Sequence, residues 1–197
     1  MSLDDDTLSI PGFDFEPPPT DEPEPEQLVA PGEVDDETPE PARPINWNLL
    51  TAEEAEVEWL ELNAWINWLR HTYGLGVGVI PPLWHRHPEL IWELSALRQH
   101  WLGAYAPNQH GSAPIGWHRD FADTRQRLHD WVAACGTRLD SDRPTRQAAW
   151  PGEDPTPTVE ESTIINRDED FVQFVRDDIA RRRAAEDAFY AQLAVGH

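Results

Sequence analysis

Eight histidines are the side chains of this 197-residue chain best suited to metal binding or proton transfer. His85 and His87 are one residue apart, so they can share an ion only if the chain bends between them. His118 and His129 lie eleven residues apart on an expected helix, about 16 Å at 1.5 Å per residue, which is too far for one ion. No His-Glu-x-x-His motif occurs. We therefore expect structural histidines, with no metal ligand and no cofactor, and a metal site is the alternative.

Nucleophilic catalysis has little support in the sequence. Cys135 is the single cysteine, so neither an intramolecular disulfide nor a multi-cysteine zinc site can form. It falls on the apolar stripe of an expected helix, where a buried thiol is the ordinary outcome. Ser95 is mid-helix, without a nucleophile-elbow motif. We assign no catalytic residue and expect a non-enzymatic protein. A metal-dependent enzyme is a third hypothesis, because catalytic groups are assembled in space rather than in sequence.

Tryptophan and arginine are typical anchors of protein interfaces, and all ten tryptophans lie between Trp47 and Trp150. Trp84 and Trp92 are not needed for the main apolar stripes of the expected helices. The sequence therefore predicts a surface that binds an unidentified protein partner, formed by Trp84, His87, Trp92, His118 and Arg125. The alternative is that Trp84 and Trp92 cover the core from the loop side.

The charge distribution bears on nucleic-acid binding. The net charge is −22, and residues 1–50 carry 14 acids and one base. Residues 62–147 carry seven acids and nine arginines, which do not form one coherent basic face. A nucleic-acid-associated protein is nevertheless the alternative function, acting through the arginine-rich loop 138–146 or through acidic mimicry of DNA.

Composition divides the chain into four parts. Residues 1–45 are acidic and proline-rich, cannot bury enough apolar surface to fold, and are expected to be a disordered arm. A tryptophan-rich helical core follows over residues 46–137, then a polar flexible linker over 138–167 and a C-terminal helix over 168–197. The expected fold is all-α, with a small three-helix core and a separate C-terminal helix.

Local signals locate the helices. Thr51 and Glu54 form a capping-box pattern, Gly74 and Gly136 are suitable helix ends, and Pro88 suits a first helical position. The first helix carries two nearly opposite apolar stripes, Trp59-Leu62-Trp65-Ile66-Leu69-Tyr73 and Val57-Leu60-Ala64-Trp68, which predict burial on both sides. The third helix has a stripe that includes Trp131 and Cys135. The last helix has a stripe from Phe171 to Leu193 that Arg182 and Glu186 interrupt.

No apolar run approaches the roughly 20 residues needed to span a bilayer. The first residues lack the basic and apolar regions of a signal peptide. The sequence therefore predicts a cytoplasmic protein without a membrane partner, and it leaves the oligomeric state open.

Residues from about 59 to 135 carry an ordered series of short motifs. They are Trp65-x-x-Trp68-Leu69, Pro81-Pro82-x-Trp84-x-x-His87-Pro88, Glu93-Leu94-Ser95-Ala96-Leu97, and Trp117-His118 followed by Arg125-x-x-Leu128. In this series the chain resembles an uncharacterised actinobacterial family found in plasmids, integrative elements and phages. The resemblance implies a helical bacterial protein of mobile-element ancestry and brings no established activity or ligand. We therefore expect a non-enzymatic accessory or adaptor protein of a mobile element that acts by protein–protein binding.

Overall fold

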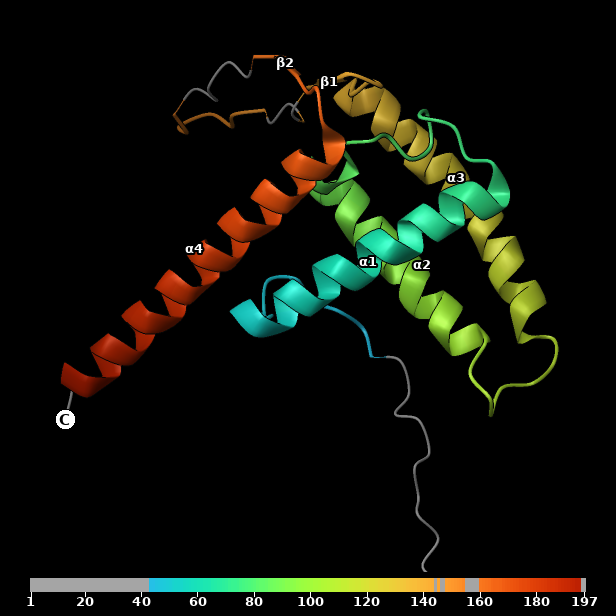
Figure 1. Ribbon diagram of the computed structural model, residues 1–197, viewed down its shortest axis with the longest axis horizontal. Coiled ribbons are helices and arrows are strands. Elements are labelled where there is room, and N and C mark those ends of the chain that lie inside the picture. Colours follow the sequence, from blue (N-terminus) through green and yellow to red (C-terminus); the bar gives the residue numbers. More distant parts are fainter. Residues whose placement is uncertain (1–42, 144, 146–147, 155–159, 196–197) are drawn as a thin grey trace, which may run out of the picture. The chain divides into compact units, whose positions relative to one another are not determined.

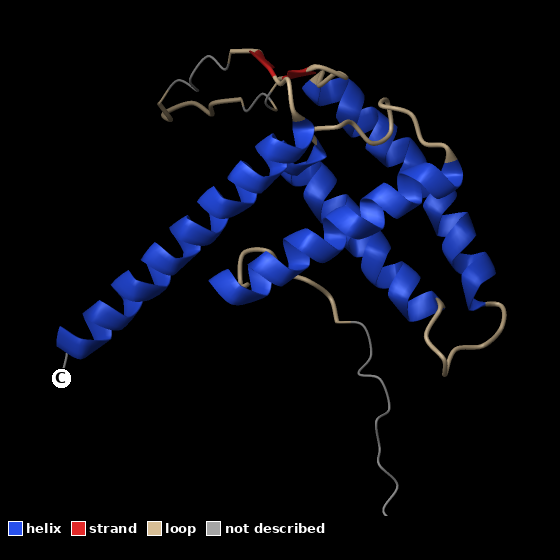
Figure 2. Cartoon of the chain, viewed as in Figure 1, coloured by secondary structure: helices blue, strands red, loops and turns tan. Residues whose placement is uncertain are grey.

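The computed structural model describes residues 43–195, except 144, 146–147 and 155–159, and the described chain is mainly helical (Figure 1, Figure 2). The elements, in chain order, are α1 (Ala52–Tyr73), the 3-10 turn η1 (Trp84–Arg86), α2 (Pro88–Ala104), α3 (Ala113–Cys135), β1 (Ser141–Asp142), β2 (Ser162–Thr163) and α4 (Arg167–Val195). The predicted all-α class is confirmed, with three helices in the middle of the chain and a C-terminal fourth helix separated from them in the sequence by β1 and β2. Most of the predicted acidic arm lies outside the described residues.

The predicted helix boundaries agree with the structure to within a residue or two. The Thr51 side chain accepts a hydrogen bond from the Glu54 backbone N–H, and the Glu54 carboxylate accepts one from the Thr51 backbone N–H. Gly74 ends α1 and Gly136 ends α3, with φ of 62° and 74°. These angles lie in the left-handed region, where glycine is favoured.

α2 and α3 pack along each other, and α1 packs on α2 and on α4 (Figure 1). Trp59 of α1 is at the centre of one aromatic cluster, its ring centroid 4.4 Å from Trp47, 6.1 Å from Trp84 and 5.4 Å from Phe174. Trp47 Nε1 donates a hydrogen bond to Ser95 Oγ at 2.8 Å. Ser95 therefore has a structural partner in the core.

A second aromatic cluster joins the end of α1 to the start of α3. Trp117 is fully buried and stacks on Phe121, with ring centroids 4.9 Å apart, and Tyr73 packs against the edge of Phe121 at 4.9 Å. Trp101 of α2 packs beside Trp68 at 5.1 Å. The tryptophans thus connect all three core helices.

The first half of α4 belongs to the same core. Phe171, Val175 and Ile179 are buried in it. Asp178 is also buried and accepts hydrogen bonds from Trp59 Nε1 at 3.0 Å and from Arg182 Nε at 2.9 Å. These contacts fix α4 against α1.

Arg182 and Glu186, which interrupt the apolar stripe of α4, attach it to the segment before α1 and to the first residue of α1. Arg182 Nη1 donates to the backbone carbonyls of Trp47 at 2.9 Å and Leu50 at 2.8 Å. The Glu186 carboxylate accepts a hydrogen bond from the Ala52 backbone N–H at 2.7 Å. Because the first N–H groups of a helix lack partners within it, Glu186 satisfies one of them from another helix.

Three expectations about burial are wrong. The second stripe of α1 is not buried, since Val57 is 51% and Trp68 40% exposed, although Trp68 packs beside Trp101 of α2. Trp131 of α3 is 43% exposed. In α4 the last buried residue among those described is Ile179, and Phe189 is 59% exposed. Glu186 already contacts Ala52, the first residue of α1, so the turns of α4 after Glu186 extend past the end of α1.

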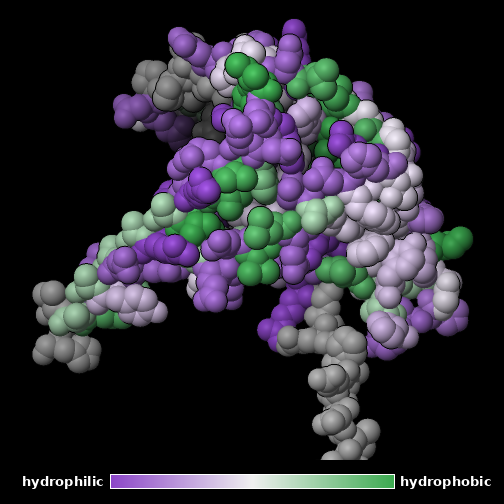
Figure 3. Space-filling view, viewed as in Figure 1, coloured by the Kyte–Doolittle hydropathy of each residue, from purple (hydrophilic) through white to green (hydrophobic). Residues whose placement is uncertain are grey.

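The predicted linker is partly structured. β1 and β2 pair antiparallel, with Ser141 opposite Thr163 and Asp142 opposite Ser162, and Ser141 and Asp142 are buried. Figure 3 shows mainly hydrophilic residues with scattered hydrophobic patches on the visible face. In the described part of the chain, no helix combines the length and the hydropathy that a membrane crossing requires.

Candidate functional site

Trp84 does not lie on a binding surface, contrary to the sequence prediction. It is 1% exposed, and its ring lies 6.1 Å from Trp59 and 6.0 Å from Phe171. Its neighbours come from α1 and α4, so η1 is covered on both sides. The alternative interpretation, that Trp84 closes the core from the loop side, is correct.

His87 is also buried, with no exposed surface, and the prediction that it contributes to a binding surface is wrong. Its Nε2 lies 2.8 Å from Asp142 Oδ1 of β1. Burial alone would lower the pKa of His87, but hydrogen bonds with Asp142 and Cys135 raise it to about 9. The segment predicted to be a linker therefore supplies the main partner of this histidine.

His85 points to a different carboxylate from His87. His85 Nε2 lies 2.7 Å from Asp170 Oδ1 of α4, and Arg86 forms an ion pair with the same carboxylate. Burial lowers the pKa of His85 to about 4, against the opposing effect of Asp170. The two histidines thus hold separate elements in place and do not share one site.

The other three predicted site residues are exposed; His118 and Arg125 both adjoin the packed rings of Tyr73 and Phe121, whereas Trp92 lies elsewhere, on α2. Trp92 borders a small hollow of about 250 Å³ with Pro44 and Ile45. His118 Nε2 lies 3.2 Å from the Tyr73 hydroxyl, and the Arg125 guanidinium lies 6.0 Å from the Phe121 ring. Among the described residues, no hydrogen bond or ring contact links these three side chains. The five predicted residues therefore do not form one surface.

The arginine-rich loop 138–146 is only partly described. Arg138 is exposed and Arg143 is half-buried, with its side chain packed against Gly136. Arg146 lies outside the described residues. Asp142, between these arginines in the sequence, is buried and engaged by His87. In the described part of this loop, Arg138 is therefore the exposed arginine.

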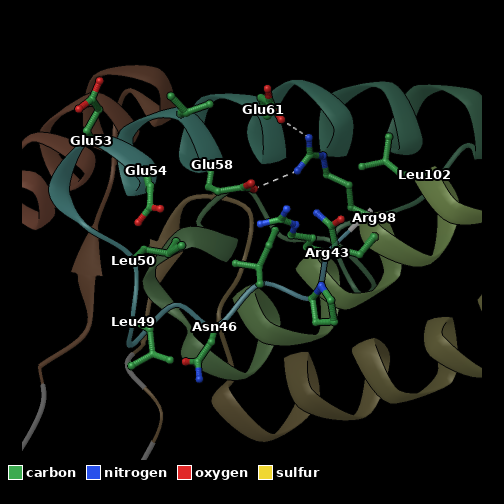
Figure 4. Close-up of a pocket in the computed structure, with 14 residues that line it drawn as sticks. Arg43, Asn46, Leu49, Leu50, Glu53, Glu54, Glu58, Glu61, Arg98 and Leu102 are labelled. Carbon is green, nitrogen blue, oxygen red and sulfur yellow. Dashed lines mark hydrogen bonds and ion pairs between the residues drawn. The ribbon is translucent and has the colours of Figure 1, made fainter. Parts of the chain in front are cut away.

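An open groove of about 730 Å³ lies between residues 43–50, α1 and α2 (Figure 4). Leu49 and Leu50 line it on the side of residues 43–50, and Leu102 lines it from α2. Leu49 is 77% exposed and Val57 of α1, also in the lining, is 51% exposed. The groove therefore has an apolar lining that is open to solvent.

Carboxylates border the groove along α1. The lining contains four glutamates and two arginines, which gives a net charge of −2; these are Glu53, Glu54, Glu58, Glu61, Arg43 and Arg98. Arg98 Nη1 donates to Glu58 at 3.0 Å and also pairs with Glu61 (Figure 4). Burial raises the pKa of Glu58, although the nearby Arg98 charge opposes the rise.

Trp92 lies next to this groove. The hollow beside Trp92 and the groove share Pro44, Ile45 and Gln99 as lining residues. The groove was not predicted from the sequence, because the expected boundary after residue 45 divides the segment 43–50 between the acidic arm and the core. The apolar residues that follow the acidic stretch, from Ile45 to Leu50, were the signal that this segment packs on the helices.

Fold and groove together define a helical, tryptophan-rich protein with an acid-bordered groove. Comparisons with protein-family models, with curated proteins and with solved structures found no match to this chain.

Proposed function

We propose that the protein is a non-enzymatic cytoplasmic adaptor whose groove binds a short segment of another protein carrying basic and aliphatic side chains. The observation that carries this proposal is the open groove between residues 43–50, α1 and α2, apolar in its lining and acidic along one side. The resemblance of residues 59–135 to an actinobacterial mobile-element family supports a role as an accessory protein of such an element.

The apolar lining favours a protein segment as the occupant. Leu49 and Val57 leave most of their surface in water, so covering them with aliphatic side chains contributes about 25 cal/mol for each Å² buried. A groove of about 730 Å³ accommodates several side chains. Trp92, at its edge, adds a half-exposed aromatic side chain of the kind that anchors interfaces.

The charges favour a basic segment. Glu54, Glu58 and Glu61 follow one face of α1 and extend over about 10 Å, at 1.5 Å per residue. Arg98 pairs with two of these carboxylates, and the lining still keeps a net negative charge. Arginine or lysine of a partner therefore finds carboxylates at helical spacing. Such complementarity mainly speeds association and selects the partner.

Selection of displayed random peptides that bind the immobilised full-length protein tests this function. We expect enrichment of peptides that combine arginine or lysine with leucine, isoleucine or phenylalanine. A Leu49→Ser, Val57→Ser variant should keep its helical circular dichroism, because both side chains are largely exposed, and should lose binding to the enriched peptides. Leu60→Ser is the matched control, since Leu60 is 57% exposed on α1 and does not line the groove.

Glu61→Gln tests the electrostatic part separately. Glu61 is half-exposed, and its loss leaves Arg98 paired with Glu58. We expect slower peptide association and a weaker dependence on salt, with little change in stability. Enrichment of acidic or uncharged peptides, or equal binding by the groove variant and the Leu60→Ser control, would overturn the proposal. Selective retention of nucleic acid by the full-length protein would favour the alternative function.

A further inference from the structure

Three potential metal ligands meet where the start of α2 lies against the end of α3, next to Asp142 of β1. A nitrogen of His87, a carboxylate oxygen of Glu89 and the sulfur of Cys135 all lie within 4.8 Å of one another. His87 Nδ1 is 3.8 Å from Glu89 Oε1. The ligand atoms of a tetrahedral zinc site lie about 3.3–3.6 Å apart, so small side-chain movements are enough to close the cluster around one ion.

The imidazole of His87 is oriented towards this cluster. His87 precedes α2 at the N-cap position, but its side chain makes no capping hydrogen bond to the helix. Its Nε2 lies 2.8 Å from the buried Asp142 Oδ1, and its Nδ1 lies on the side of Glu89. The Thr145 hydroxyl lies 3.3 Å from Nδ1 and donates a hydrogen bond to Glu89, so an ion bound here takes the place of this hydroxyl between the two ligands. A carboxylate behind the second ring nitrogen is the usual support of a metal-binding histidine, because it fixes the ring and makes it a stronger ligand.

The charges of the cluster match a divalent ion. A Cys135 thiolate and the Glu89 carboxylate together carry two negative charges, which one divalent cation balances. Arg86 Nη1 lies 3.8 Å from Asp142 Oδ2 and offsets the charge of the supporting carboxylate. A sulfur, nitrogen and oxygen donor set suits zinc or cobalt(II), whereas magnesium and calcium prefer oxygen ligands alone.

We propose that His87 Nδ1, Glu89 and Cys135 bind one zinc-class divalent ion, with Asp142 positioning the histidine and water as the fourth ligand. Binding displaces two protons to solvent, the thiol proton of Cys135 and the Nδ1 proton of His87, while His87 Nε2 keeps its proton towards Asp142. His87 and Cys135 are buried, at 0% and 3% exposed, so the ion is closed off from substrates and serves a structural role. It joins the start of α2 to the end of α3. This proposal does not depend on the groove or its partner.

Metal analysis and cobalt titration of the full-length protein test the site. We expect about one zinc ion per chain after purification without chelators. Cobalt(II) added to the chelator-treated protein should give the thiolate-to-cobalt charge-transfer band of a sulfur-ligated ion. Cys135→Ala should abolish this band while keeping helical circular dichroism, because alanine suits a buried helical position. Asp142→Asn should keep the band and weaken binding by about 10- to 100-fold.

His129→Gln is the matched control, because His129 is an exposed histidine on the same helix as Cys135 and should leave stoichiometry and affinity unchanged. Absence of the charge-transfer band in the wild-type protein overturns the proposal, whatever the variants do. Equal metal binding by the Cys135→Ala variant also overturns it, since the ion would then lie elsewhere.

Discussion

Replacing Trp84 by alanine distinguishes a core role for the turn before α2 from a role on a binding surface. Trp84 is 1% exposed and packs between Trp59 of α1 and Phe171 of α4. Alanine at this position leaves a cavity bordered by three separate elements. Because each neighbour is itself held by further contacts, the cavity should collapse only in part.

The expected loss follows from the buried area. A tryptophan buries about 150–250 Å², which at about 25 cal/mol per Å² corresponds to about 4–6 kcal/mol. Tryptophan-to-alanine substitutions in cores cost about 3–5 kcal/mol. The buried Trp84 indole N–H has no hydrogen-bond partner among the described residues, so its removal offsets part of the loss. We expect Trp84→Ala to lower the free energy of unfolding by about 3–4 kcal/mol, and Trp84→Phe to lower it by less.

Urea unfolding followed by far-ultraviolet circular dichroism measures this loss independently of tryptophan fluorescence. With a denaturant slope of about 2 kcal/mol per molar urea, the midpoint should fall by about 1.5–2 M. Trp92→Ala is the control, because Trp92 is 39% exposed, and it should cost about 1 kcal/mol or less. A loss at Trp84 no larger than the loss at Trp92 would refute the core assignment.

Three further predictions concern the chain ends and α4. Burial alone would raise the pKa of Asp178, but hydrogen bonds from Trp59 and Arg182 and the charge of Arg182 lower it below its ordinary value. The ionised Asp178 carboxylate therefore stabilises the fold above about pH 4, and this stabilisation is lost as the pH falls towards the lowered pKa of the folded state. Asp178→Asn should therefore be less stable at pH 7, and its free energy of unfolding should fall less steeply in acid. Glu186→Ala should lower the unfolding free energy by about 1 kcal/mol, as for a lost helix cap, whereas Glu186→Gln, which keeps an acceptor for the Ala52 N–H, should cost less. Deleting residues 1–42 should leave helical circular dichroism and the thermal midpoint nearly unchanged, because that segment has the composition of a chain that cannot fold; a clear drop in the midpoint would contradict this.

Helix boundaries were predictable because their signals are local. Thr51, Gly74 and Pro88 each act on backbone groups within one turn, and the structure confirms all three. Burial was less predictable, because it depends on partners distant in sequence. Trp84 is covered by Phe171, and His87 is held by Asp142. The helical periodicity around Trp84 and His87 does not reveal Phe171 or Asp142, because both lie far away in the sequence.

The candidate sites show the same limit. The groove depends on how residues 43–50 cross α1 and α2, and no motif specifies that crossing. Cys135 was correctly expected to be buried on the apolar stripe of α3. Its proximity to His87 and Glu89 arises only when the end of α3 meets the start of α2. Periodicity predicts which face of a helix is apolar, but not which side chains face each other across two helix ends.

The hydrogen bonds from Arg182 to the backbone of Trp47 and Leu50 have a consequence for the order of events during synthesis. The wall of the groove formed by residues 43–50 is fastened by a side chain that follows Trp47 by 135 residues in the sequence. At about 5–20 residues per second, the ribosome needs about 7–27 s to add that length of chain. Late in this interval, once α3 has been made, the nascent protein has its tryptophan-rich helices but still lacks the hydrogen bonds of Arg182 to the groove wall. The groove should therefore be completed only after α4 has emerged, so that truncated or unfinished chains do not compete for the partner.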